Sequence, residues 1–241
     1  MMKDNNILKF RPGLKDCWNS YMVKGASFAK NDIPICPTII SKLPIKIITW
    51  IEAKKIHKKL MQKDSNYVSD AFICFYIDDQ FFDGPRSSIW TFSKEALSVI
   101  NHFRGIITPD FSSYVDFPKP LLLYNTYRMR TFGYWIGCCG KEVINNVRWG
   151  YDDTYQYCFE GIEKDSIVAI GTVGGSPRKL VDRERFELGF YEMIGILKPR
   201  SIIVYGSANY SCFEKAIANG IEIIEYPSHT NMAFKKGAMN E

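Results

Sequence analysis

Short apolar runs recur from Ala71 onwards, and a segment with helical character separates each run from the next. Runs such as 166–170 (SIVAI) and 201–205 (SIIVY) are continuous, not alternating, which indicates strands that are covered on both faces. Strand–helix–strand connections favour parallel pairing with right-handed crossovers. We therefore predict an α/β fold with a mostly parallel sheet of about six to seven strands that alternate with helices.

Two arrangements of such a sheet agree with this pattern. Polar residues follow nearly every expected strand, and no glycine-rich dinucleotide loop follows any of them. This favours a closed or incomplete β/α barrel, whose ligands bind at the carboxyl ends of the strands. The alternative is an open, doubly wound sheet, which binds ligands at the same ends.

The expected elements follow from apolar periodicity and from turn residues. A capping pattern at Thr91 or Ser93 marks the start of one helix, and Gly140 marks the end of another. The expected strands are 45–49, 71–77, 105–108, 142–147, 166–172, 201–205 and 221–226. The expected helices are 51–63, one from residue 91, 120–137, 154–162, 183–197 and 211–219.

The domain organisation follows from where periodicity begins. Residues 1–44 show little periodicity and carry several turn residues, so we expect an irregular N-terminal arm packed on the body. Residues 45–241 are expected to form a single α/β domain, a length that can bury a sizeable core.

Composition limits the cellular setting and the kind of ligand. The formal net charge of +5 allows contact with phosphate but is far from the dense basic patch of a dedicated nucleic-acid binder. Seven scattered cysteines show no metal-ligand spacing, which favours a reduced, cytosolic setting. No apolar stretch approaches a membrane span, so no membrane contact is expected. The sequence names neither a cofactor nor a metal, and its three histidines form no HxH or HxxxH pair.

The candidate site consists of polar side chains at the carboxyl ends of the expected strands. Asp110, in the turn TPDFS, is the expected catalytic residue, as a general base or a carboxylate that holds an ion; the alternative is turn capping. Only one of the adjacent residues Asp78 and Asp79 is expected to point into the site. The expected ligand-binding residues at the strand ends are Asp78, Asn146, Arg148, Trp149 and Thr172.

Asn146 and Arg148 should project to the same side of their strand, whereas Trp149 alternates away. A tryptophan there can stack on a base or a sugar ring, although packing in the core is the commoner role.

Two arginines lie on the expected helix 120–137. Helical spacing places Asn125 and Arg128 on one face and turns Arg130 about 200° from Arg128. The two arginines therefore cannot clamp one anion together. We expect one arginine to hold structure through a carboxylate or a carbonyl, and Asn125 and Arg128 to contribute to ligand binding, with Arg128 reaching a phosphate.

A series of motifs between Ala71 and Gly206 is similar to an uncharacterised family of unknown function that is carried by phages, plasmids and conjugative elements of Gram-positive bacteria. The resemblance implies an accessory protein of a mobile element that acts in the cytosol of the host bacterium, and it supplies no assigned catalytic residues. The motifs are FYIDDQFFD, GIITPDFSSYVDFP, NTYRMRTFGYW, VINNVRWG, CFEGIEKDSIVAIGTVG, FELGFYEMIGILKP and IIVYG.

Three functional hypotheses follow from these observations. The first is a strand-end cleft that binds a phosphorylated ligand, a nucleotide or a nucleic-acid end, with hydrolysis assisted by Asp110. The second is a non-enzymatic factor that inhibits or sequesters a host defence protein, because aromatic residues also suit protein interfaces. The third is a DNA replication or transfer accessory protein that binds through its lysines. A homo-oligomer agrees with each of them.

Overall fold

A computed structural model describes residues 10–63, 66–173 and 180–228. In this part of the chain, seven strands form one sheet, every neighbouring pair is parallel, and the strands follow one another in chain order from β1 to β7. The predicted α/β fold is confirmed, including its first strand. The strands are β1 (Ile47–Thr49), β2 (Ser69–Cys74), β3 (Phe103–Ile107), β4 (Glu142–Asn146), β5 (Ile167–Gly171), β6 (Ser201–Tyr205) and β7 (Glu222–Tyr226).

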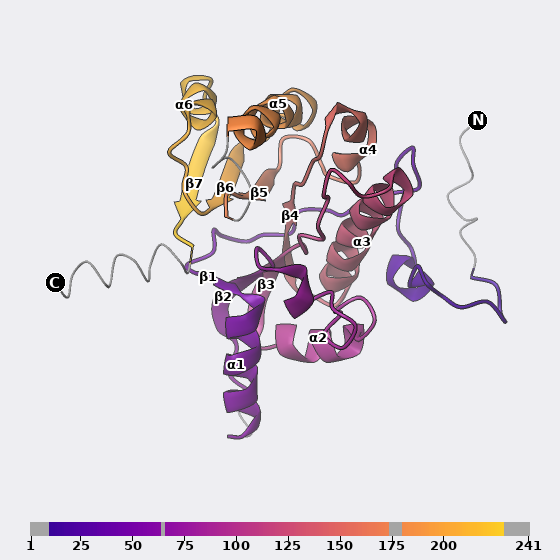
Figure 1. The fold of residues 1–241 in the computed structure, drawn as a ribbon. Helices are drawn as coiled ribbons and strands as arrows, with labels where there is room; N and C mark the ends of the chain where they lie inside the picture. The colour runs from indigo at the N-terminus through magenta and orange to yellow at the C-terminus, as the bar shows by residue number, and fades with distance from the viewer. Residues whose placement is uncertain (1–9, 64–65, 174–179, 229–241) are drawn as a thin grey trace.

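The sheet curls into an incomplete barrel, with β1 and β7 as its two edges (Figure 1). The hydroxyl of Tyr226 at the end of β7 donates a hydrogen bond of 2.6 Å to the carbonyl oxygen of Pro44, shortly before β1. The strand order contains no reversal, unlike the order of a doubly wound sheet. Of the two predicted arrangements, the structure has the incomplete barrel.

Alternate strand residues face the inside and the outside of the curl. On β2, Phe72 and Cys74 belong to the inner apolar cluster, whereas Ile73 packs outward. The same alternation on β4 places Ile144 inside and Val143 outside. This is the two-residue period of a strand, and it decides which side chains reach the mouth of the barrel.

The helices cover the outer face of the sheet in two groups (Figure 1). The first three pack on β1–β4 and the others mainly on β5 and β6. They are α1 (Trp50–Met61), α2 (Ser93–Ile100), α3 (Lys119–Cys138), α4 (Tyr155–Cys158), α5 (Leu180–Leu197) and α6 (Ser211–Ala218). Short 3₁₀ turns occur at η1 (Ser20–Val23), η2 (Asp79–Phe81) and η3 (Asp152–Thr154). Among the described residues, no helix combines the length and the apolar character needed to cross a membrane.

Several helix ends differ from the predictions. The N-cap of α2 is Phe92, without a side-chain capping bond, so the predicted caps Thr91 and Ser93 are wrong. The hydroxyl of Ser93 lies 2.5 Å from that of Tyr21 instead. The expected helix 154–162 is the shorter α4, preceded by η3. Gly140, with a φ of 80°, does follow the end of α3 as predicted.

The residues before β1 lie against α3. The hydroxyls of Tyr124 and Tyr127 donate to the carbonyl oxygens of Cys17 and Trp18, respectively. A short antiparallel bridge joins Ile39 to Val143 on β4. These contacts agree with an arm that packs on the body, and the division at residues 44 and 45 stays a prediction. Residues 1–9 and 229–241, which the predicted arm and domain include, lie outside the described part.

Candidate functional site at the strand ends

A cleft of about 910 Å³ lies at the carboxyl ends of the strands. This is where parallel β/α folds bind their ligands, and its volume suits a small molecule. Loops after β2, β3 and β4 and the start of α5 supply most of its walls. Its polar lining comprises Tyr76, Asp78, Asp79, Asp110, Ser112, Ser113, Tyr114, Asp116, Asn146, Arg148, Asp182 and Arg185.

Asn146 is the fixed centre of this cleft, because each of its polar groups has a partner. Its backbone N–H donates to Oγ1 of Thr108 at 2.8 Å, and its backbone carbonyl accepts from Arg130 at 2.9 Å. Its side-chain oxygen accepts from the hydroxyl of Tyr76 at 3.0 Å, and its side-chain nitrogen donates to Oδ1 of Asp110 at 2.9 Å. The Tyr76 hydroxyl can donate to the amide oxygen only, and the Asp110 carboxylate can accept from the amide nitrogen only. This network therefore orients the Asn146 amide and holds one oxygen of Asp110.

Arg148 approaches the other oxygen of the same carboxylate. Its Nη1 atom lies 3.5 Å from Oδ2 of Asp110. The arginine side chain is 29% exposed, and within the described residues its ion-pair partner is Asp110. The remaining guanidinium N–H groups are therefore available to an anion that enters the cleft.

Tyr76 forms the inner wall below Asn146. Its ring stacks on Tyr205 with centroids 5.4 Å apart. A Cβ added to Gly171 on β5 would lie 2.5 Å from the Tyr76 ring, so this glycine makes room for the tyrosine. Burial raises the pKa of Tyr76 well above its ordinary value, and the negative charge of Asp110 adds to the rise. Tyr76 is therefore a neutral hydrogen-bond donor at physiological pH.

Asp79 brings a second carboxylate into the cleft. Its oxygens accept from the hydroxyl of Ser112 at 2.8 Å and from the Ser112 backbone N–H at 3.2 Å. Burial raises the pKa of Asp79; the Ser112 bonds oppose this, and the nearby carboxylates of Asp110 and Asp83 reinforce it. Two carboxylates in unlike surroundings are a common basis for acid–base chemistry.

Asn125 and Arg128 hold the loop that carries Ser112 and do not line the cleft. Asn125 donates to the carbonyl of Ser112 at 2.6 Å and accepts from the Arg128 guanidinium at 2.6 and 3.2 Å. Arg128 also pairs with Asp83 at 2.8 Å and lies 3.9 Å above the Phe111 ring centroid. The two residues share a helix face, as predicted. The guanidinium has a supporting position beside Asn125 and Asp83, and its predicted contact with a phosphate stays a prediction.

Arg130 supports the site from behind. It is fully buried and donates to the backbone carbonyls of Glu160, Asn146 and Cys158 at 3.1, 2.9 and 3.2 Å. Arg130 is thus the arginine that holds structure through carbonyl groups, as predicted for one of the two. Its cation ties the end of β4 to the segment around α4.

The remaining predicted residues have mixed positions. Asp78 and Asp79 both line the cleft, and Oδ1 of Asp78 accepts a hydrogen bond from the backbone N–H of Gln80 at 3.0 Å. Trp149 lines the cleft and packs on Phe186 with ring centroids 5.3 Å apart. Thr172 is buried, donates to the carbonyl of Ser207 at 2.8 Å and does not line the cleft.

The expected ligand-binding residues do not include Tyr76 or Ser112, and they include Asp79 only as the alternative to Asp78. The alternation in AFICFYI contains a signal for Tyr76, since Phe72, Cys74 and Tyr76 share the inner face. The contact between Asp79 and Ser112 joins two loops, and no local pattern indicates it. In the described part of the chain, no group of three or more His, Cys, Asp or Glu side chains is arranged to hold a metal ion.

The fold and the cleft together define a class: a parallel, incomplete β/α barrel with an aspartate-rich, arginine-containing cleft at its strand ends. The chain belongs to a family described as "Domain of unknown function (DUF4417)", whose model matches residues 30–227. It is 28% identical over 219 residues to the Gene 1 protein of Mycobacterium phage D29, a match that spans 91% of this chain and 74% of the relative. The Gene 1 protein of Mycobacterium phage L5 is 29% identical over 219 residues, spanning 91% and 88%. No solved structure matches the chain. The predicted resemblance to an uncharacterised family found in phages is confirmed.

Proposed function

We propose that the protein is a phage accessory protein that binds a phosphorylated ligand, a nucleotide or a nucleic-acid end, in the cytosol of the bacterial host. The observation that supports this most directly is the Arg148–Asp110–Asn146 arrangement in the strand-end cleft. Arg148 supplies N–H donors for a phosphate, and Asp110 accepts hydrogen bonds from the sugar hydroxyls of the same ligand.

The charge of the cleft narrows the ligand class. Its described lining contains the carboxylates of Asp78, Asp79, Asp110, Asp116 and Asp182, against the guanidinium groups of Arg148 and Arg185. Arg185 is already paired with Asp182 at 2.7 Å. Such a surface repels a free phosphate but suits a phosphate joined to a group rich in hydrogen-bond donors. A nucleotide has this composition, and the Tyr76, Tyr114, Trp149 and Phe186 rings supply apolar wall for a base.

Hydrolysis is the catalytic part of the proposal. Asp110 is held in one orientation by Asn146 and Arg148. A carboxylate fixed in this way can accept a proton from a water molecule that attacks the bound ligand. Asp79, in the segment after the neighbouring strand β2, is the second carboxylate available for proton transfer.

The binding proposal is tested by native mass spectrometry of the purified protein, followed by denaturing extraction and titration calorimetry with AMP, ribose 5-phosphate and inorganic phosphate. We expect a co-purified nucleotide and tighter binding of AMP than of inorganic phosphate. Arg148→Ala should weaken AMP binding about tenfold or more, the loss of a charge-assisted contact. Arg200→Ala, an exposed arginine before β6, is the matched control. Equal AMP affinity in wild type and Arg148→Ala would refute the site.

The catalytic part has its own readout. Asp110→Asn retains the approximate shape of the side chain but removes its charge, so it should abolish product formation from a bound nucleotide. Chromatography of the nucleotide after incubation measures this. If Asp110→Asn turns over at the wild-type rate, Asp110 is not the base, even where Arg148 is confirmed as a ligand.

The same mass spectrometry distinguishes the alternative hypotheses. A stoichiometric host protein bound in place of a nucleotide would favour an inhibitor or a sequestering factor directed at host defence. A clean homo-oligomer without ligand would favour an interaction role for the cleft face.

A further inference from the structure

Helix α1 carries an unbalanced positive charge. Between Trp50 and Lys63 the chain has five lysines and a single acidic residue, Glu52. Lys55, Lys58, Lys59 and Lys63 are exposed, and within the described residues none of them forms an ion pair. Elsewhere, Lys42 and Lys119 are paired with Asp70 and Asp153 at 3.0 and 2.8 Å. These four lysines, three on α1 and Lys63 just after it, form a concentrated cationic surface, here called the α1 lysine track.

The apolar side of α1 is already covered by the protein. Trp50 and Ala53 are buried, and Ile56 packs against the same outer cluster of the barrel. A helix that binds a membrane surface must offer an apolar face to the lipid as well as a basic one. Because the apolar face of α1 is buried against the barrel, its lysines suit a water-exposed polyanion better than a lipid surface.

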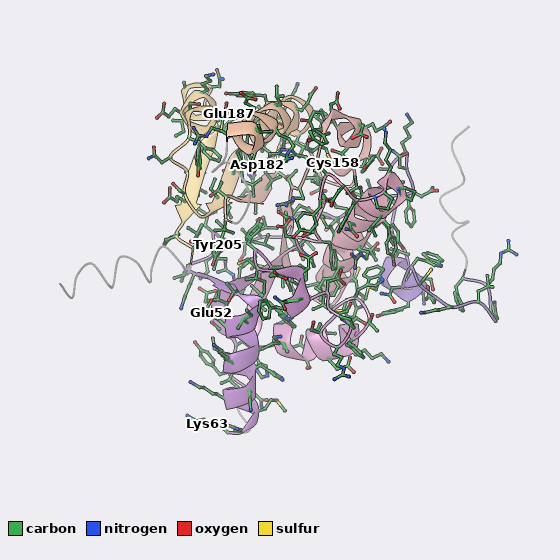
Figure 2. The ribbon with its side chains drawn as sticks, in the orientation of Figure 1. Glu52, Lys63, Cys158, Asp182, Glu187 and Tyr205 are labelled. Atoms are coloured by element: carbon green, nitrogen blue, oxygen red, sulfur yellow. The ribbon has the colours of Figure 1, made fainter. Side chains whose placement is uncertain are left out.

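The α1 lysine track starts at the rim of the strand-end cleft. Ile51 in the first turn of α1 lines the cleft, and Lys54 donates to the carbonyl of Phe81, another lining residue, at 3.2 Å. Figure 2 shows Glu52 near the body of the molecule and Lys63 at the outer end of the helix. From Lys55 to Lys59 the helix rises about 6 Å, and Lys63 follows two residues after the helix ends, so the four lysines can contact successive phosphates of a nucleic-acid strand.

We infer that the ligand is a nucleic-acid strand, whose phosphates lie along the α1 lysine track while one end enters the strand-end cleft. The position of the end in the cleft rests on the proposed function; binding along the track does not. Arg148 then holds the terminal phosphate, and each lysine contact releases counterions from the strand. Affinity therefore falls as salt rises.

The test is fluorescence anisotropy with a labelled single-stranded oligonucleotide of about 12 nucleotides, at salt concentrations from about 50 to 200 mM. The variant Lys55→Gln/Lys58→Gln/Lys59→Gln removes three track charges. It should weaken oligonucleotide binding about tenfold or more and reduce the slope of log affinity against log salt by about 2. AMP binding, measured by calorimetry, should be unchanged, and circular dichroism should confirm that the variant is folded.

The matched control is Lys15→Gln/Lys24→Gln/Lys30→Gln, which removes the same charge from exposed lysines before β1. It should bind the oligonucleotide as the wild type does. An equal loss in both triple variants would mean that net charge alone attracts the strand, and the inference would be wrong.

The two proposals fail separately. If AMP binds but the oligonucleotide binds no more tightly, the track inference is overturned and the cleft remains a nucleotide site. If the oligonucleotide binds through the track while AMP does not bind, the cleft proposal fails and the track is supported. Lysine-dependent binding to anionic phosphatidylserine vesicles, without oligonucleotide binding, would replace the inference with a membrane contact.

Discussion

The side-chain nitrogen of Asn146 lies 2.9 Å from Oδ1 of Asp110, and this contact joins the carboxyl ends of β4 and β3. The orientation of the Asp110 carboxylate is therefore fixed by its neighbours. Asn146 orients it and is itself oriented by Tyr76, Thr108 and Arg130. Substitutions at the residues that orient Asn146 should consequently affect the site through the Asp110 carboxylate.

Tyr76→Phe should disturb the site through Asn146. The substitution removes the hydroxyl that donates to the Asn146 side chain at 3.0 Å and leaves a buried acceptor without a partner. We expect a loss of about 1 kcal/mol in the free energy of unfolding and a several-fold weaker affinity for AMP. Urea denaturation and calorimetry measure the two effects. The control Tyr191→Phe, on the exposed side of α5, should change neither the stability nor the affinity. Unchanged AMP binding in Tyr76→Phe would show that the orientation of Asn146 does not depend on the tyrosine.

Asp79→Asn should stabilise the protein at neutral pH. Because burial raises the folded-state pKa of Asp79 above its ordinary value of 3.8, the folded state binds this proton more tightly than the unfolded state does. The resulting stability is present below the unfolded pKa and is lost as pH rises through the folded pKa. The neutral asparagine avoids that loss.

The check is the urea midpoint of wild type and Asp79→Asn at pH 7 and near pH 3. A higher midpoint for the variant at pH 7, with little difference at the lower pH, is the expected result. A variant less stable than wild type at pH 7 would mean that the two Ser112 hydrogen bonds outweigh the cost of burying the charge.

His57→Gln should reduce the sensitivity of the protein to mild acid. Burial lowers the pKa of His57 below 6.5, and His102, whose ring centroid is 5.0 Å away, lowers it further. The unfolded state therefore binds the proton more tightly. Stability contributed by neutral His57 is present above pH 6.5 and is lost as pH falls through the lower, folded-state value. The difference in urea midpoint between wild type and His57→Gln, followed from pH 8 to pH 5, should change below 6.5; a constant difference would contradict this prediction.

Arg130→Met should destabilise the fold strongly. The substitution leaves the backbone carbonyls of Glu160, Asn146 and Cys158 without their donor. Burial lowers the pKa of Arg130 to about 10, so the guanidinium stays charged at neutral pH and donates to all three. We expect a loss of about 3 kcal/mol in the free energy of unfolding. Chemical denaturation measures it, and Arg200→Met on the surface should cost little; a small cost for Arg130→Met would mean that water satisfies the carbonyls.

The sequence by itself determined the strand-and-helix order and the neighbourhood of the cleft. Continuous apolar runs are sufficient to predict parallel strands, and parallel strands bring their carboxyl ends to one edge. Asp110, Asn146 and Arg148 could therefore be expected together, because each lies at or just after the end of a strand and Asn146 and Arg148 are two residues apart.

The tertiary structure decided which polar residues face the cleft and which support it. Arg128 and Thr172 have the chemistry of ligand-binding residues, but Asp83 and the carbonyl of Ser207 engage them. Asp79 meets Ser112 across 33 positions of chain because two loops fold over the same barrel mouth. Sequence periodicity describes neighbours within one element, whereas contacts between loops depend on the curl of the whole sheet, and the curl is set by packing among all seven strands.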